Sequence, residues 1–116
     1  MTDPKSIAVA YYVALGEKKL EEVKKFIHPE IQFSDPMEKV IGKEPFLQAA
    51  KKFSSVFKTL TIREQFGSEN RAVIVYEVEI PTLPKKILAV SLLGFKEGLI
   101  ASIELIYDTR NFLPRT

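Results

Sequence analysis

Residues 71–108 read RAVIVYEVEI-PTLP-KKILAVSLLGFK-EG-LIASIELIYD, and this stretch decides the fold. Its three runs of aliphatic and β-branched residues are separated by short segments with proline or glycine, which is typical of strands joined by tight turns. Just before it, residues 60–66 alternate apolar and polar side chains, and Gly67–Asn70 fits a hairpin loop. The sequence therefore predicts a four-stranded antiparallel meander over residues 60–108.

The first half of the chain predicts helices and two short strands. Asp3 and Pro4 fit an N-cap and the first position of a helix that runs to about Leu15. A second helix is expected over about residues 18–27, and a third begins near Pro45. Short strands are expected at 31–34 and 40–41. Helices followed by strands favour one α+β domain over residues 1–116, with three N-terminal helices packed on the curved four-stranded sheet.

Composition narrows the classes of partner. The 17 basic and 15 acidic residues nearly balance and are spread along the chain, which argues against a nucleic-acid partner. The chain has no cysteine and one histidine, His28, so neither disulfides nor a metal site are expected. The apolar run at residues 7–15 is too short to cross a bilayer, and the first residues lack the order of a signal peptide. We therefore expect a cytoplasmic protein without membrane contact.

The strands predicted at 71–80 and 85–96 are apolar on both faces. An antiparallel sheet with one face in water alternates more cleanly between apolar and polar side chains. Three helices can cover only one face, so a partner is needed for the second. The sequence therefore predicts a homodimer packed through the sheet.

Four segments carry a more specific pattern: YYVAL at 11–15, HPEIQFSDP at 28–36, IGKE at 41–44, and the final hairpin at 95–108. With the order of elements, they resemble the nuclear transport factor 2-like superfamily, and within it the SnoaL-like proteins and ketosteroid isomerases. The resemblance covers nearly the whole chain. It implies a cystatin-like cone of helices and sheet around one apolar pocket.

The resemblance also implies roles for three residues. In ketosteroid isomerases, the aspartate of an Asp-Pro pair after the first strand is the general base, and Asp35 matches it. A tyrosine of the first helix donates a hydrogen bond to the developing enolate oxygen, and Tyr12 matches it. Ser91 lies where the family has a protonated aspartate as second donor. The implied reaction is proton transfer next to the carbonyl of a small apolar molecule, of isomerase or cyclase type, with no cofactor.

Strand alternation, started from Ser91 and Tyr107, which the family pattern places inward, predicts which side chains of the sheet face this pocket. Phenylalanines from outside the meander are expected on its other side. The predicted ligand-binding set is Phe33, Phe57, Tyr76, Val78, Ala89, Ile103, Leu105 and Tyr107.

A simpler interpretation stays open for each residue. Asp35 fits an ordinary turn whose carboxylate binds nearby backbone N–H groups, and Tyr12 fits a packing residue of an apolar helix. The domain would then bind a ligand without catalysis or serve through dimerisation. The surroundings of Asp35 distinguish these hypotheses, because a base needs a protected carboxylate near the pocket.

Overall fold

The computed structural model describes residues 3–112 of the chain. Its α-helices are α1 (Pro4–Gly16), α2 (Leu20–Val23) and α3 (Lys43–Ser54). Its strands are β1 (Ile27–Ser34), β2 (Lys39–Ile41), β3 (Thr59–Gly67), β4 (Arg71–Glu79), β5 (Ile87–Lys96) and β6 (Leu99–Tyr107). Two short 3₁₀ helices, η1 (Lys24–Phe26) and η2 (Thr109–Phe112), complete the order.

The sheet has six strands in the order β2-β1-β6-β5-β4-β3. Strands β3 to β6 form the antiparallel meander that the sequence predicts. The prediction of a four-stranded sheet was wrong, because β1 pairs in parallel with β6 and β2 pairs with β1. This pairing supplies backbone partners along the open edge of β6, which would otherwise be an unprotected edge strand.

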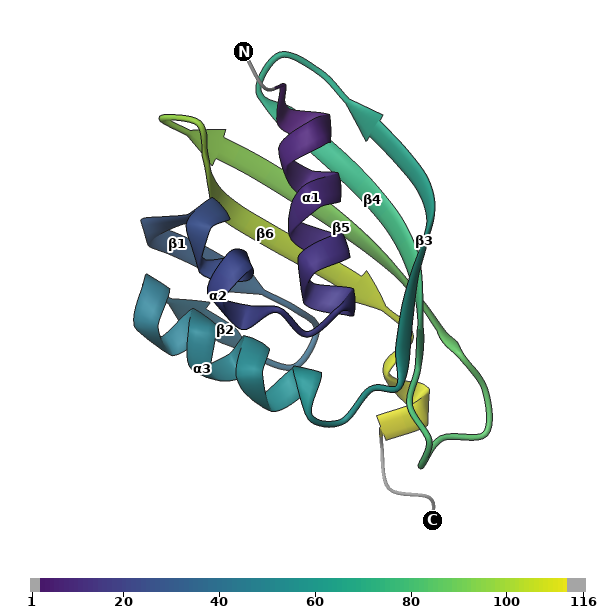
Figure 1. The fold of residues 1–116 in the computed structure, drawn as a ribbon. Helices are drawn as coiled ribbons and strands as arrows, with labels where there is room; N and C mark the ends of the chain where they lie inside the picture. Colours follow the sequence, from purple (N-terminus) through teal and green to yellow (C-terminus); the bar gives the residue numbers. More distant parts are fainter. Residues whose placement is uncertain (1–2, 113–116) are drawn as a thin grey trace.

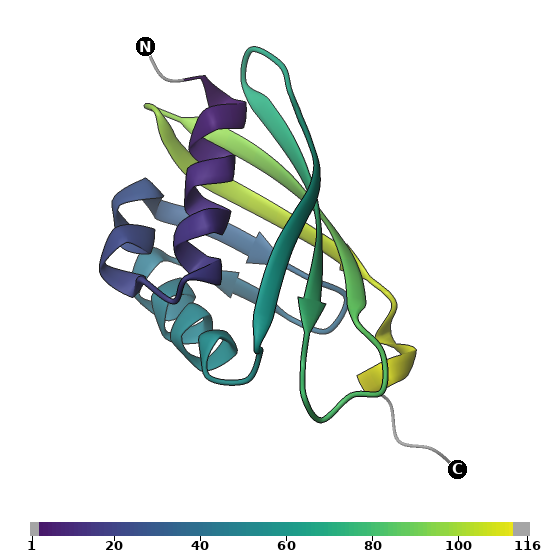
Figure 2. The same cartoon turned by 45° about the vertical axis from the view of Figure 1, so that its right-hand side comes forward.

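The α-helices form a layer over one face of the sheet (Figure 1). Helix α1 lies across β3 and β4, while α3 lies beside β1 and β2. Register shifts in β3 and in the β5–β6 pair accompany the curvature of the sheet around α1 (Figure 2). The core fills the space between the two layers, and its fully buried side chains include Ala8, Val23, Ile31, Ile74, Leu93 and Ile100.

Helix α1 begins as the sequence predicts. The Asp3 carboxylate accepts a hydrogen bond from the backbone N–H of Ser6 at 2.8 Å, and Pro4 is the first helical residue. These contacts satisfy part of the unpaired N–H groups at the start of a helix. In the part of the chain that the structure describes, no helix is long and apolar enough to cross a membrane.

The second helix is shorter than expected. The sequence pattern suggests a helix to about residue 27, but α2 ends at Val23 and one 3₁₀ turn leads into β1. Ile27, the first residue of β1, pairs with Ile100 of β6 and is fully buried. Its burial in the sheet therefore outweighs the local preference for helix.

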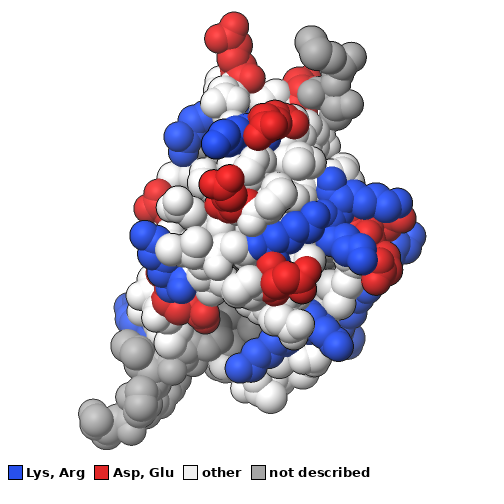
Figure 3. All heavy atoms as spheres, turned by 90° about the vertical axis from the view of Figure 1, so that its left-hand side faces the viewer, with Lys and Arg blue, Asp and Glu red and all other residues white. Residues whose placement is uncertain are grey.

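Charged side chains around α2 are paired with one another. Lys24 lies 2.8 Å from Glu21, and Lys25 lies 3.2 Å from Glu22. On this side of the molecule acidic side chains lie among basic ones (Figure 3). Such mixing is typical of a helix face in water.

Candidate functional site

Asp35 lies directly after β1, in the turn that leads to β2. Its Oδ1 accepts hydrogen bonds from the backbone N–H groups of Met37 and Glu38, both at 2.8 Å. Its own N–H donates to the carbonyl of Glu38 at 2.9 Å. This is the turn of the simpler interpretation, and it holds the carboxylate in one orientation.

The second carboxylate oxygen has a different partner. The hydroxyl of Tyr107, at the end of β6, donates to Oδ2 of Asp35 at 3.4 Å. Burial and the negative charge of Asp35 raise the pKa of Tyr107 to about 12. The tyrosine is therefore protonated near neutral pH and can act as a donor. Asp35 itself is partly buried, so it lies at the edge of the interior rather than within it.

Tyr12 and Ser91 meet inside the protein. The Tyr12 hydroxyl donates to Oγ of Ser91 at 2.7 Å, and the two residues are only 3% and 0% exposed. Burial raises the pKa of Tyr12 to about 12. Its hydrogen bonds with Ser91 and Tyr76 lower the pKa by a smaller amount. The structure thus brings together the two residues that the resemblance assigns to an oxyanion.

Three tyrosines form one aromatic cluster in the interior. The Tyr12 ring centroid lies 4.7 Å from that of Tyr11 and 4.7 Å from that of Tyr76. Burial raises the pKa of both neighbours well above the usual value. Sequence reasoning placed Tyr76 on the inner face but missed its hydrogen bond to Tyr12. Strand parity indicates that Tyr76 faces the helices. It does not indicate where helix α1 crosses the sheet, which decides whether Tyr12 lies next to Tyr76.

The predicted pocket-facing side chains share one face of the sheet. Ala89 pairs with both Tyr76 and Tyr107, and Ser91 pairs with Leu105. The remaining members are buried or partly buried on the helix side, where the Phe33 ring lies 5.7 Å from that of Phe46. Their contact with a ligand stays a prediction.

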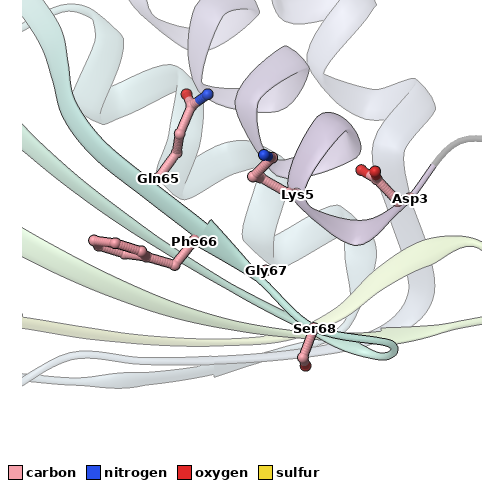
Figure 4. A pocket seen from close by; sticks show the side chains of 6 residues that line it. All are labelled: Asp3, Lys5, Gln65, Phe66, Gly67 and Ser68. Atoms are coloured by element: carbon pink, nitrogen blue, oxygen red, sulfur yellow. The ribbon is translucent and has the colours of Figure 1, made fainter.

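Two surface pockets lie away from these residues. One, of about 380 Å³, is lined by residues at the start of α1 and the end of β3, among them Lys5 and Gly67 (Figure 4). The other, of about 760 Å³, lies between α1 and α2. Asp35, Tyr12 and Ser91 line neither pocket. A ligand that reaches Ser91 would therefore have to replace its hydrogen bond with Tyr12.

His28, in β1, contacts neighbouring protein groups through both of its ring nitrogens. Its Nε2 lies 3.1 Å from Oε1 of Glu97, and its Nδ1 accepts the backbone N–H of Glu30 at 3.0 Å. Nδ1 is therefore unprotonated in this arrangement, and Nε2 carries the proton. Within residues 3–112, no group of three or more histidine or carboxylate side chains could hold a metal ion.

Comparison with known families gives one match over most of the chain. The model of the SnoaL-like domain family matches residues 8–103. A search of curated proteins found no significant match.

Solved structures share this fold. A nuclear transport factor 2-like protein of unknown function from Cytophaga hutchinsonii is 21% identical, with a TM-score of 0.85 over 97% of this chain and 96% of that one. A putative ketosteroid isomerase from Kribbella flavida is 14% identical, with a TM-score of 0.77 over 97% and 89%. An LEH-like epoxide hydrolase from M. tuberculosis is 10% identical, with a TM-score of 0.79 over 93% and 84%. At these identities the likeness establishes the fold alone.

Proposed function

Because the chain belongs to the SnoaL-like domain family, we propose that it binds a small apolar molecule through a carbonyl oxygen, with Tyr12 and Ser91 as hydrogen-bond donors. One observation carries the proposal. The Tyr12–Ser91 contact joins two hydroxyl groups within the core, beside the hydroxyl of Tyr76, where apolar side chains of similar size would serve packing equally well. Both hydroxyls can instead donate to one acceptor oxygen of a ligand that enters between them.

The inner face of the sheet suggests how such a ligand would extend. Ser91 lies opposite Leu105, two residues before Tyr107 on β6. Diagonal neighbours of this kind are about 7–8 Å apart. Tyr107 in turn contacts Asp35. A molecule of several carbon atoms bound at Tyr12 could thus bring a C–H group toward the carboxylate.

The chemistry of this arrangement is a proton transfer. Oδ2 of Asp35 would take a proton from the carbon next to the carbonyl, while the Tyr12 hydroxyl donates to the developing enolate oxygen. The protonated Asp35 would then return the proton to another carbon, which completes an isomerisation without a cofactor. The likeness in fold to a putative ketosteroid isomerase is consistent with this reaction.

Binding is testable with 2-naphthol, an apolar aromatic alcohol whose oxygen imitates an enolate oxygen. We expect its fluorescence to report saturable binding that Tyr12→Phe weakens about fivefold, the value of one neutral hydrogen bond. Tyr11→Phe is the matched control, since it removes a hydroxyl from the neighbouring buried tyrosine and should change the affinity less than twofold. Wild-type protein that does not bind 2-naphthol would reject the proposed binding site.

Proton transfer is testable with 2-tetralone, an apolar ketone with acidic C–H groups next to its carbonyl. NMR in D₂O should show that the protein accelerates exchange of these hydrogens, and that Asp35→Asn lowers the acceleration about 100-fold or more. Asp108→Asn, which changes an exposed carboxylate that pairs with Arg110, should leave the rate unchanged. Equal rates for wild type and Asp35→Asn would exclude Asp35 as the base.

A second candidate function, dimerisation, rests on the face of the sheet opposite the helices. Phe66, Leu88 and Ile106 lie on this face and are 56%, 50% and 48% exposed. Partly buried apolar residues of β4 and β5 lie between them, because Phe66 pairs with Val73 and Ile106 pairs with Val90. An apolar surface that continues across neighbouring strands in this way is typical of an interface. We propose a second copy of the chain as the occupant.

Charge supports a symmetric partner. Arg71 begins β4 on this face, and Glu79 ends the same strand on the same face. If two copies pack with their β4 strands antiparallel, the basic end of each strand meets the acidic end of the other. Such self-complementarity is what a two-fold interface requires.

Sedimentation velocity tests the dimer. We expect wild type to sediment as a dimer at micromolar concentration, and Leu88→Lys to shift it to a monomer. Val56→Lys is the matched control, because Val56 is 49% exposed but lies after α3, away from this face. A monomeric wild type at all concentrations would contradict the proposal.

A further inference from the structure

The turn that follows α1 holds a lysine in a backbone conformation that suits glycine. Lys18 has a φ of 61°, its N–H donates to the carbonyl of Leu15 at 2.9 Å, and the N–H of Lys19 donates to that of Ala14 at 2.9 Å. Many helices end in this pair of bonds, and the left-handed residue within it is usually glycine, because a side chain there is strained. A lysine at this position is therefore expected to contribute through its side chain.

The Lys18 side chain makes two contacts with the segment that joins α3 to β3. Its Nζ donates to the backbone carbonyl of Phe57 at 2.6 Å and lies 4.7 Å from the centroid of the Phe57 ring. Phe57 is 2% exposed, and its ring centroid lies 4.8 Å from that of Phe53 near the end of α3. A charged hydrogen bond and a cation–π interaction thus join the α1–α2 turn to a segment 39 positions away.

This contact lies at the end of the sheet that carries Asp35. Strand β3 begins two residues after Phe57 and pairs there with the end of β4, and β5 begins opposite Val78. Tyr107, the last residue of β6, lies at the same end of the sheet and contacts Asp35. The α1–α2 turn and the α3–β3 segment therefore border the inner face near the proposed base.

We propose that Lys18 is a latch on the inner face of the sheet. While its ammonium group is bound at Phe57, the α3–β3 segment is closed, and release of this contact opens the interior. Tyr12 and Ser91 are sealed from solvent and line neither surface pocket, so a ligand can reach them only if part of the surrounding wall moves. The role in ligand entry rests on the proposed function, whereas the opening can be measured without that ligand.

A single introduced thiol tests the opening, because the chain has no cysteine of its own. Val78→Cys places the thiol on the inner face beside the latch, at a position that is 4% exposed, and its reaction with dithiobis(nitrobenzoate) is followed by absorbance. Lys18→Met keeps a long side chain but removes the charge, and should speed this reaction about tenfold, the value of one hydrogen bond to a charged group. Lys19→Met is the matched control, since Lys19 pairs with Glu17 of its own turn, and should leave the rate unchanged.

A second cysteine separates opening at the latch from a general loss of stability. Ala72→Cys lies on the same face at the opposite end of β4, where Ala72 pairs with Gly67 and is 2% exposed. Lys18→Met should leave the labelling rate at this position unchanged. Equal acceleration at positions 72 and 78 would mean that Lys18 only stabilises the fold, and an unchanged rate at position 78 would mean that it closes nothing. Either result would overturn the proposal.

Two alternatives keep the test decisive if a variant does not fold. Lys18→Gly suits the left-handed backbone and should open the wall as Lys18→Met does. Amide hydrogen exchange can replace the thiols. The N–H of Phe57, which donates to the carbonyl of Phe53 at 3.3 Å, should exchange about tenfold faster without the latch, relative to amides of the central strand β5. An unchanged ratio of these exchange rates would overturn the proposal.

Binding of 2-naphthol separates the latch from the proposed function. In stopped-flow fluorescence, Lys18→Met should raise the association and dissociation rate constants together and change the affinity less than twofold. Faster thiol labelling in protein that does not bind 2-naphthol upholds the latch and rejects the proposed function. Binding of 2-naphthol with unchanged labelling does the reverse.

Discussion

Replacing Tyr12 by phenylalanine and Ser91 by alanine, singly and together, measures what their buried hydrogen bond contributes to stability. The contact is short, at 2.7 Å, and both residues are sealed from solvent. Each single change leaves a hydroxyl group without its partner in a place that water does not reach. The double change removes both hydroxyls of this pair, and the Tyr76 hydroxyl then loses its bond to Tyr12 just as it does in Tyr12→Phe.

The magnitudes follow from this difference. Tyr12→Phe deprives Ser91 of its donor and also ends the hydrogen bond with Tyr76, so we expect a loss of about 1–2 kcal/mol in the free energy of unfolding. Ser91→Ala leaves the Tyr12 hydroxyl without the acceptor of its proton, with only the bond to Tyr76 remaining, and should cost about 1–3 kcal/mol. The double variant should lose no more than the costlier single variant, which gives a coupling energy of about 1 kcal/mol or more.

Urea unfolding followed by circular dichroism gives the free energies of unfolding of the four proteins. Thermal unfolding provides a check, because the Tm of a chain of 116 residues should fall by about 4 °C for each kcal/mol lost. Losses that simply add in the double variant would refute the reasoning, because they would mean that the two hydroxyls do not interact. Equal slopes in urea for all four proteins are needed for the comparison.

Three further predictions concern the scaffold and its pH dependence. Gly67→Ala should destabilise the protein by about 1–3 kcal/mol in urea unfolding, since its new Cβ would lie 2.7 Å from Cβ of Lys5, and an unchanged midpoint would contradict this close packing. Asp3→Ala should cost about 1 kcal/mol through loss of the cap on Ser6, and Asp3→Asn, which can still accept the bond, should retain most of the stability. The contribution of Tyr12 to stability should be constant up to about pH 10 and fall toward pH 12, because an unfolded tyrosine ionises near 10 and folded Tyr12 only at about 12; urea midpoints should fall less steeply over this range in Tyr12→Phe.

Local patterns in the sequence predict most of the elements but not how they all pair. The alternation and turns after residue 60 predict the meander correctly, since antiparallel neighbours joined by short loops leave little choice of partner. The short strands in the first half are also recognisable. Their place beside β6 is not, because the parallel pairing of Phe33 with Ile103 joins distant segments and has no local signal.

The candidate site, too, could be predicted only in part. Strand parity and the resemblance place Ser91 and Tyr107 on the inner face, where the structure has them. The contact of Tyr107 with Asp35 escaped prediction, because it depends on how far a curved strand carries its last residue toward a turn 72 positions away in the chain. Such a distance is set by tertiary packing, which periodicity does not describe.

The parallel pairing of β1 with β6 also governs how the chain must fold during synthesis. The growing chain can form its helices and the early hairpins of the meander as they emerge, but β1 has only the short strand β2 beside it, and is not joined to the rest of the sheet, until the final strand leaves the ribosome. Closure of so large a loop is slow, so the last step of folding is expected to join the two ends of the chain. Ribosome-bound chains that stop before residue 99 should therefore leave β1 open to proteases, whereas those that expose residue 107 should protect it.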